Sequence, residues 1–281
     1  MKSSWRQVLR GFSARIALMG KYWAIFKINW EKSFEYRADF IGHLGMGIIT
    51  FIVMFFIWKA VFSGRDNFNG YTFSSMMTYV LMTKFLHFTQ RQNIGRQMAW
   101  EIKEGRMSLY LLKPTSYLKW WLSIFLADRS FEFFIRLGMI IIFFLLLPKI
   151  VVFSGLEQFV LFLSFLFFSL VINFLTNVFT ASFAFWLTDV RLFRSAMFMI
   201  FNFFAGGLVP LDVMPPFLQK IGLALPFQYT TYFPIKLYLG QLEMWEAISG
   251  LITVLIWILG LFILMKFIWK RGLRRYEAVG Q

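Results

Sequence analysis

The sequence contains no cysteine and only two histidines, which limits the chemistry that the chain can carry. The absence of cysteine excludes disulfides and thiolate metal sites. The histidines, His43 and His87, lie in separate segments and do not form the H-E-x-x-H spacing of a zinc site. A lone histidine in an apolar segment is more often a packing residue than a metal ligand. We therefore expect no metal site and no catalytic centre here.

Acidic side chains are also scarce: Asp and Glu total 14 against 29 Lys and Arg, and the formal net charge is +15. The chain lacks the G-x-x-x-x-G-K-[ST] loop that cradles nucleotide phosphates, so ATP binding of that kind is excluded. Ion-driven carriers often place acids deep in the bilayer, and the predicted spans hold no such deep acids. We expect a protein that is not itself an enzyme and binds no cofactor.

Apolar residues, in contrast, make up 59% of the chain, and aromatic residues 21%. Residues 158–188 contain no charged side chain, and as a helix they would extend for roughly 46 Å, more than the ~30 Å hydrocarbon core of a bilayer. The alternative, a buried helix of a soluble domain, rarely reaches this length without a charge. The sequence predicts an all-α, polytopic membrane protein.

The remaining apolar runs extend this prediction to a single transmembrane domain covering residues 1–281. Polar turns and basic segments separate six predicted spans, at residues 40–62, 71–88, 124–147, 158–188, 195–209 and 247–265. Short polar or basic connections of this kind are typical of polytopic helical membrane proteins.

The N-terminal segment, residues 1–39, has the pattern of an amphipathic helix. Its apolar residues recur at spacings of three and four, at Ile16, Met19, Trp23, Phe26, Trp30 and Phe34. Such a helix is expected to lie in the membrane interface with its aromatic edge in the lipid. The alternative is a helix packed on the protein's own surface.

Residues 210–246 are interrupted by proline and glycine but stay apolar, which is unusual for a solvated loop. Between Asp212 and Glu243 the charged residues are Lys220 and Lys236. We expect short broken helices at about 217–225 and 229–239 that re-enter the bilayer against the bundle.

Basic residues are distributed unequally between the two sides of this topology. The N-terminal segment, the 89–120 loop, the 189–194 turn and the 266–281 tail together hold 21 Lys and Arg, whereas the opposite loops hold 4. Because positive charge gathers on the cytoplasmic side, both termini and the 89–120 loop are predicted to be cytoplasmic. The 210–246 segment is then extracellular.

A few charges fall within or beside the spans. Asp128, Arg129, Glu132 and Arg136 lie near the entry of the third span, with Glu132 between neighbours on one helical face. We interpret them as a structural network, and a role in gating or coupling motion is the alternative. Lys84, near the end of the second span, is expected to extend its stem to the interface, and substrate binding is its alternative role.

The cytoplasmic loop contains the most distinctive polar segment, residues 94–114. An amphipathic helix is expected around Ala99 to Lys103, followed by a break at Gly105 and a short apolar run that ends at Pro114. Mixed charge beside Trp100 and Tyr110 favours a protein contact. The alternative is an interfacial helix that binds lipid headgroups.

These features together resemble an ABC-2 type transporter permease over nearly the whole chain. The resemblance rests on the N-terminal helix, E-x-x-E-G-R-x-x-x-x-L-L-K-P at 101–114, G-G-L-V-P-L-x-x-M-P at 206–215 with L-P-F at 225–227, and R-R-Y-E-A-x-G at 274–280. It implies the membrane subunit of a bacterial exporter in the cell (inner) membrane.

The resemblance also implies partners and site residues. Two permease subunits, identical or related, would pair, and each would dock a separate ATPase subunit that binds ATP and Mg. The ATPase-coupling residues would be Trp100, Glu101, Lys103, Glu104, Gly105, Arg106, Leu109, Leu111 and Leu112. The extracellular gate would contain Gly206, Gly207, Pro210, Pro215 and Pro226.

The expected function is ATP-driven export of a hydrophobic or amphipathic substrate, such as a drug, antibiotic, lipid or glycan. Two alternatives remain at this stage. One is a carrier or lipid scramblase that needs no nucleotide. The other is an intramembrane enzyme using His43, His87 and the charges between Asp128 and Arg136.

Overall fold

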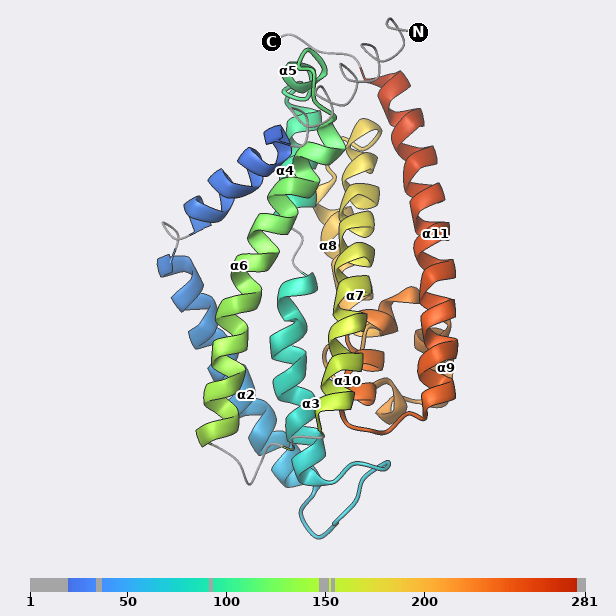
Figure 1. Ribbon diagram of the computed structural model, residues 1–281. Helices are drawn as coiled ribbons and strands as arrows, with labels where there is room; N and C mark the ends of the chain where they lie inside the picture. The colour runs from blue at the N-terminus through green and yellow to red at the C-terminus, as the bar shows by residue number, and fades with distance from the viewer. Residues whose placement is uncertain (1–19, 34–36, 91–92, 147–151, 153–154, 277–281) are drawn as a thin grey trace, which may run out of the picture.

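The computed structural model describes residues 20–33, 37–90, 93–146, 152 and 155–276, and its regular elements are all helices (Figure 1). The predicted all-helical class is confirmed for these residues. The longer helices are α2 (Arg37–Val61), α3 (Phe73–Leu86), α4 (Asn93–Lys103), α6 (Tyr117–Leu146), α7 (Leu156–Ser182), α8 (Arg191–Phe204) and α11 (Met244–Arg275). The short ones are η1 (His87–Gln90), α5 (Ser108–Leu111), η2 (Phe183–Phe185), η3 (Leu211–Val213), α9 (Pro216–Ala224), η4 (Pro226–Thr230) and α10 (Tyr232–Tyr238).

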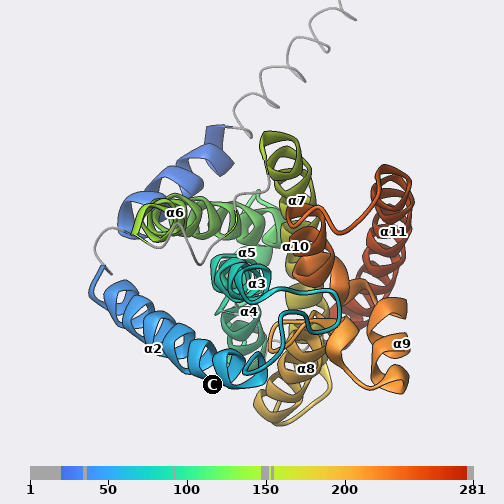
Figure 2. The ribbon, with the colours of Figure 1, turned by 90° about the horizontal axis from the view of Figure 1, so that it is seen from below.

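The helices form an elongated bundle with two different ends (Figure 1). One end, here called the α5 end, carries α5 and the last turns of α11. The opposite end, the α9 end, carries α9, α10 and the loop between α2 and α3. Seen along the axis, α3 lies inside a ring of other helices (Figure 2). The two ends therefore collect different loops of the chain.

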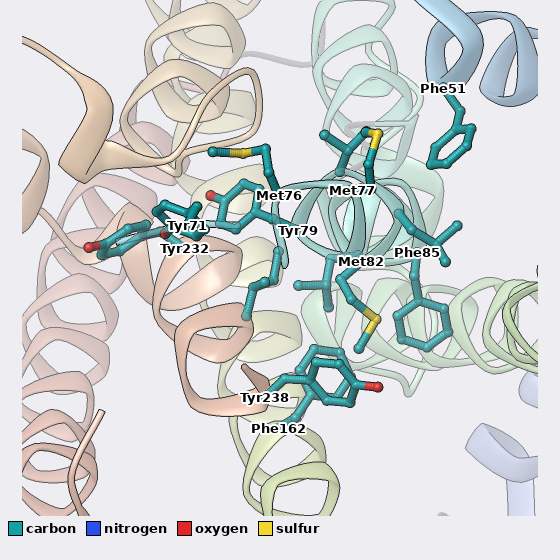
Figure 3. Packing of buried hydrophobic residues seen from close by; sticks show 14 of the residues in the cluster. Phe51, Tyr71, Met76, Met77, Tyr79, Met82, Phe85, Phe162, Tyr232 and Tyr238 are labelled. Atoms are coloured by element: carbon teal, nitrogen blue, oxygen red, sulfur yellow. The ribbon is translucent and has the colours of Figure 1, made fainter. Parts of the chain in front are cut away.

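The centre of the bundle is built on α3 and α7. α3 is apolar on all sides, and from Met76 to Leu86 nearly every side chain is buried, as expected for a helix with no polar face. Its side chains pack against Phe51 of α2, Phe162 of α7 and Tyr238 of α10 (Figure 3). α7 packs against α4, α10 and α11. The apolar part of α7 is accordingly 44% buried, whereas that of α11 is 11% buried.

Within the part of the chain that the structure describes, two helices are long and apolar enough to cross a membrane by themselves, namely Leu156–Phe185 and Met244–Arg275, and Gly47–Val61 is a shorter apolar helix. α3 and α8 have 14 residues each, which corresponds to about 21 Å and is less than the bilayer core. α6 is long but carries several charges in its centre. The six-span topology therefore stays a prediction.

Large apolar side chains cover the outer faces of α2 and α11. Exposed residues on α11 recur at helical spacing and include Ile248, Ile252, Leu255, Leu259 and Phe262. Continuous apolar surface on this scale is unusual for a protein in water but is normal for a helix that faces lipid. The arrangement fits a location in the membrane.

The central helix α3 ends half way along the bundle. Buried polar side chains form hydrogen bonds where it ends. The Ser169 hydroxyl on α7 donates to Thr89 Oγ1 at 3.0 Å and lies 3.2 Å from the Thr230 carbonyl oxygen. The Gln90 amide donates to the Thr231 hydroxyl. Irregular backbone at this depth is tolerated where protein groups satisfy its hydrogen bonds.

The N-terminal segment is helical over residues 20–33 and runs obliquely along the outside of α6 (Figures 1 and 2). Tyr22 accepts a hydrogen bond from the Ser116 backbone N–H at 3.0 Å, and the rings of Trp30 and Phe131 are 6.2 Å apart. Trp23 is 65% exposed and stacks on Phe26. Ile16, Met19 and Phe34 lie outside the described residues, and the interfacial location of the helix stays a prediction.

Candidate functional site

Helix α4, the first element of the predicted coupling loop, has one buried and one exposed face. Ile94, Met98 and Ile102 are buried, while Trp100 is 44% exposed. α4 approaches α7 at Gly95, whose N–H donates to Asn177 Oδ1 at 3.0 Å. A Cβ at Gly95 would lie only 2.8 Å from Asn177, so glycine allows this close approach. The exposed face, with Lys103 and Glu104, is open to a partner.

The predicted break at Gly105 is present in the structure. Gly105 has a φ of +69°, a left-handed conformation that glycine adopts without strain and that ends α4. The chain then turns into α5. Leu109 is 58% and Leu112 86% exposed, and the guanidinium carbon of exposed Arg106 lies 4.5 Å from the centroid of the Trp100 ring. The side chain of Leu111 lies outside the described part of the chain.

Glu101 differs from the other predicted coupling residues because its side chain points inward and is 5% exposed. Its carboxylate accepts hydrogen bonds from the hydroxyls of Tyr110 at 3.2 Å and Tyr117 at 2.8 Å. Tyr117 also stacks on Trp269 of α11, with ring centroids 5.6 Å apart. Buried carboxylates need such partners. Glu101 therefore connects α4 to α5 and α6, and its buried carboxylate is not available to a partner protein.

The environment of Glu101 changes the acidity of both phenols. Burial, together with the Glu101 carboxylate, raises the pKa of Tyr110 to about 12 and raises that of Tyr117 further. Both hydroxyls therefore stay protonated, and remain donors, across the physiological range. The Lys113 ammonium lies 4.9 Å from the centre of the Tyr110 ring and 5.5 Å from that of Trp120, which adds cation–π attraction to the cluster.

A groove of about 1060 Å³ lies beside the exposed face of α4. Its other wall is the 188–194 turn with the start of α8, where Arg191 is held by Asp189 at 3.1 Å. Hydrogen bonds from Arg191 lower the pKa of the Asp189 carboxyl, so the turn keeps both charges. The groove has mixed charge, with Arg96, Lys103, Glu104, Asp128 and Arg194 among its lining residues. Sequence reasoning placed this turn on the same side but did not predict that it borders α4.

Two hydrogen bonds tie the α5 segment to the ends of the described chain. The Ser108 N–H donates to the Tyr276 hydroxyl at 3.2 Å, and the Ser116 N–H donates to the Tyr22 hydroxyl at 3.0 Å. Tyr276 also packs edge-on against Phe185 at 5.9 Å. These contacts connect the 108–116 segment to the end of α11 and to the N-terminal helix.

At the α9 end, the predicted gate residues mark the starts of short helices and one tight turn. Pro210 and Pro215 precede η3 and α9, and Pro226 is the first residue of η4, where its fixed φ favours helix initiation. Gly206 has a φ of +77°, and its carbonyl accepts a hydrogen bond from the Tyr79 hydroxyl at 2.7 Å. Gly207 lies directly against Asn202. The turn after α8 is thus fixed to the central helix α3.

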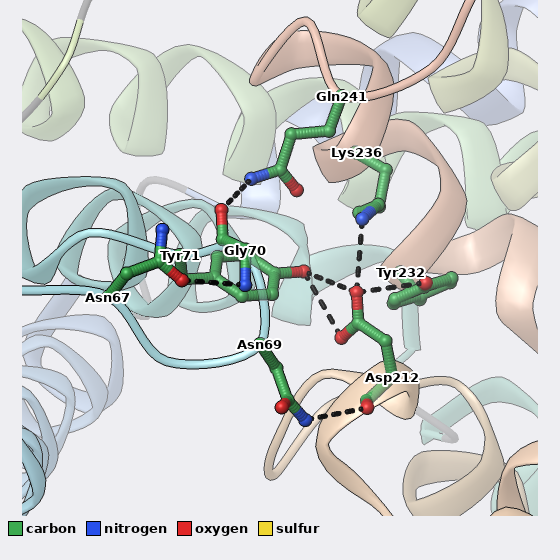
Figure 4. A network of polar contacts seen from close by, with 8 residues as sticks. All are labelled: Asn67, Asn69, Gly70, Tyr71, Asp212, Tyr232, Lys236 and Gln241. Carbon is green, nitrogen blue, oxygen red and sulfur yellow. Dashed lines mark hydrogen bonds and ion pairs between the residues drawn. The ribbon is translucent and has the colours of Figure 1, made fainter.

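A buried polar cluster at Asp212 closes this end (Figure 4). The Asp212 carboxylate accepts hydrogen bonds from Tyr71 at 3.1 Å and Tyr232 at 3.2 Å and pairs with the Lys236 ammonium at 3.0 Å. Its backbone carbonyl accepts from the Asn69 amide at 3.1 Å. The cluster joins the 63–70 loop, η3 and α10. Sequence reasoning missed it, although a lone acid in an apolar segment requires a basic or hydrogen-bonding partner.

Of the four charges on α6 that the sequence groups together, Arg129, Glu132 and Arg136 lie close to one another. Glu132 lies 3.5 Å from Arg129 and 3.9 Å from Arg136, and both arginines are largely buried. Arg136 also donates to the Lys84 carbonyl oxygen at 2.7 Å. Asp128 instead borders the groove beside α4. Because α6 begins at Tyr117, the network lies in the middle of the helix, whereas the sequence places it near the entry of a span.

A family model described as "ABC-2 family transporter protein" matches residues 48–280. The match begins within α2. It includes the helices that border the groove beside α4 and the segments that form the Asp212 cluster. Among curated proteins, none matches the chain.

Proposed function

Because the chain belongs to the ABC-2 family of transporter proteins, we propose that it is the permease subunit of an ATP-binding cassette transporter in a bacterial cell membrane. Permeases of this family generally work with an ATPase subunit. The proposed complex contains two permease subunits, identical or related, and two copies of a separate ATPase subunit that binds ATP and Mg. It exports a hydrophobic or amphipathic substrate, and both termini are cytoplasmic.

The observation that best supports coupling to an ATPase is the surface at the α5 end. There α4 and α5 present Trp100, Arg106, Leu109 and Leu112 to the outside, beside the groove that the 188–194 turn borders. Aromatic and arginine side chains are enriched at protein interfaces and supply much of their binding energy. This surface would contact the ATPase subunit.

The contacts below that surface suggest how a push on α5 reaches the rest of the bundle. Glu101 and Tyr117 connect α4 to α6, and Tyr117 stacks on Trp269 of α11. α6 and α11 are the longest helices, at 30 and 32 residues. Tilting them would change the packing at the α9 end, where the Asp212 cluster and the Gly206 turn close the bundle. The cycle of ATP binding and hydrolysis would open and reclose that end.

The test is purification of the tagged chain from cells that make the complete complex. We expect an ATPase subunit to co-purify, and transport to depend on ATP. Replacing exposed Lys103, Glu104 and Arg106 by serine should uncouple hydrolysis from transport, since these side chains lie on the proposed contact. The matched control replaces Arg65, Asp66 and Lys220, which are exposed charges at the α9 end, and should leave coupling unchanged.

Two results would contradict the proposal. Normal coupling after the first set of replacements would exclude α4–α5 as the contact. Transport in liposomes by this chain alone, without nucleotide, would favour a carrier or lipid scramblase instead.

A further inference from the structure

Lys84 lies in the last turn of the central helix α3, beside the middle of α6. Its backbone carbonyl accepts the 2.7 Å hydrogen bond from Arg136, which lies in the central part of α6. α3 continues through η1 and does not reach the α5 end (Figure 1). The lysine therefore occupies the interior of the bundle, not a helix end at the membrane surface.

Lys84 lines a mostly apolar pocket of about 50 Å³ between α2, α3 and α6. The pocket walls are largely aromatic and aliphatic, with Phe51, Phe85, Ile140 and Phe143, and Arg136 is the second cationic lining residue. A pocket of this size admits a carboxylate or phosphate group more readily than a whole drug-sized molecule.

The two cations differ in how their charges are balanced. Arg136 is 3.9 Å from Glu132. Within the described residues, the Lys84 side chain forms no ion pair or hydrogen bond, and it is partly buried. A cation within a membrane helix is costly unless it is paired, and such residues commonly mark substrate or ion sites. The described residues that line the pocket thus include two cations and no acidic side chain, a lining that an anion would complement.

Space for a ligand exists on the side of α2. A Cβ built on Gly47, which lines the pocket, would have no heavy atom within 4 Å. Lys84 also borders a second small pocket that reaches Gly207 and Pro210 of the gate segment and is lined by Trp58 and Tyr79. Lys84 therefore borders both the pocket beside α6 and the pocket that reaches the gate segment.

We propose that Lys84, with Arg136, binds the acidic headgroup of an amphipathic anion whose apolar tail lies along the pocket wall of α2 and α6. This proposal names the substrate class of the transporter. Its role in transport rests on the proposed function. The anion has two possible sources, a free amphipathic acid or an anionic lipid of the bilayer, and both present the same chemistry.

The test measures binding to the purified full chain in non-ionic detergent, without ATPase, by native mass spectrometry. The first probe pair is dodecanoate against dodecanol, and the second is phosphatidylglycerol against phosphatidylcholine. We expect the acid of at least one pair to be retained and its neutral or zwitterionic counterpart to be lost. Lys84→Gln should reduce retention of that acid about tenfold or more, the loss expected for a charge-assisted hydrogen bond.

Three variants separate binding from folding. Lys84→Arg keeps the charge and should retain the acid. Gly47→Leu fills the open space and should abolish binding while Lys84 is intact. Lys220→Gln removes an exposed lysine at the α9 end and should bind as the unchanged chain does. The Tm of each variant shows whether it is folded.

Retention of dodecanoate alone identifies a free acid as the ligand, and retention of phosphatidylglycerol alone identifies a lipid. Three results would overturn the site. They are equal retention of the acid by folded Lys84→Gln, equal binding of dodecanol and dodecanoate, and no binding of dodecanoate or of phosphatidylglycerol. These results are independent of the ATPase. Binding without ATPase coupling would contradict only the proposed function, and coupling without binding would contradict only the site.

Discussion

The two ends of the bundle use polar residues in opposite ways. At the α9 end, Asp212 and Lys236 turn inward, and their side chains are 17% and 15% exposed. At the α5 end, the ion pair of Asp189 and Arg191 is on the outside, and Trp100, Arg106 and Leu112 are exposed. The ion pair at the α9 end is thus enclosed by the protein, whereas the pair at the α5 end and its apolar neighbours face outward. Substitutions at the two ends should therefore affect different measurements.

The largest effect on stability is expected for Asp212→Ala. Removing the carboxylate leaves the largely buried Lys236 cation and two phenols without their partner, which should cost about 3 kcal/mol, or roughly 6 to 12 °C in Tm. Thermal unfolding in detergent measures the loss. Asp212→Ala combined with Lys236→Met should recover part of it, since no unpaired charge remains.

The matched change at the other end is Asp189→Ala. Because the Asp189–Arg191 pair is exposed, the change should cost less than about 1 kcal/mol. A similar loss of Tm from both substitutions would remove the difference between the two ends.

A smaller loss is expected for Gly206→Ala at the α9 end. The φ of +77° strains alanine, and the added Cβ would lie 2.7 Å from the Tyr79 hydroxyl that donates to this residue. The combined cost should be about 2 kcal/mol in thermal unfolding. Gly240→Ala is the control, since its φ is +65° but no atom lies within 4 Å of the new Cβ. Equal losses would show that the Tyr79 contact contributes nothing.

At the α5 end, Trp100→Ala should leave Tm nearly unchanged but weaken binding of the ATPase subunit about tenfold, or ~1.4 kcal/mol. The reason is that Trp100 is 44% exposed and supports Arg106 by a cation–π contact at 4.5 Å. A pull-down titration with the ATPase measures the change. Trp245→Ala, an exposed tryptophan at the start of α11, is the control. Equal effects of the two substitutions would argue against a specific contact at α4.

The smallest effect concerns pH. The folded-state pKa of Tyr110 is raised to about 12, above its ordinary value near 10. The stability that this phenol contributes is fully present below pH 10 and is lost as the pH rises through about 12, because the unfolded chain ionises first. Between pH 10 and 12, the Tm of Tyr110→Phe should therefore fall by about 1 to 2 °C less than the Tm of the unchanged chain. An identical decrease in both proteins would contradict the contact with Glu101.

Much of the local structure could be predicted from the sequence. The uncharged run at 158–188 predicts the long helix α7, the prolines predict the short helices α9 and α10, and Gly105 predicts the break after α4, because each depends on residues close together in the chain. The family followed from the order of such local motifs.

What could not be predicted depends on contacts between distant segments. Asp212 pairs with Lys236 and not with Lys220, which is nearer in the sequence. The pairing depends on the position of α10 in the folded chain. Glu101 was grouped with the exposed coupling residues, although its spacing from Met98 and Ile102 places it on the buried face of α4. The depth of Lys84 likewise depends on where α3 ends relative to α6.

The orientation of the two ends can be measured directly because the natural chain has no cysteine to interfere. Single cysteines replace Glu104 at the α5 end and Lys220 at the α9 end, both exposed, and intact cells are treated with a membrane-impermeant maleimide. We predict that Lys220→Cys is labelled in intact cells and that Glu104→Cys is labelled only after the membrane is opened. Labelling of Glu104→Cys from outside would contradict the assignment of the α5 end to the ATPase.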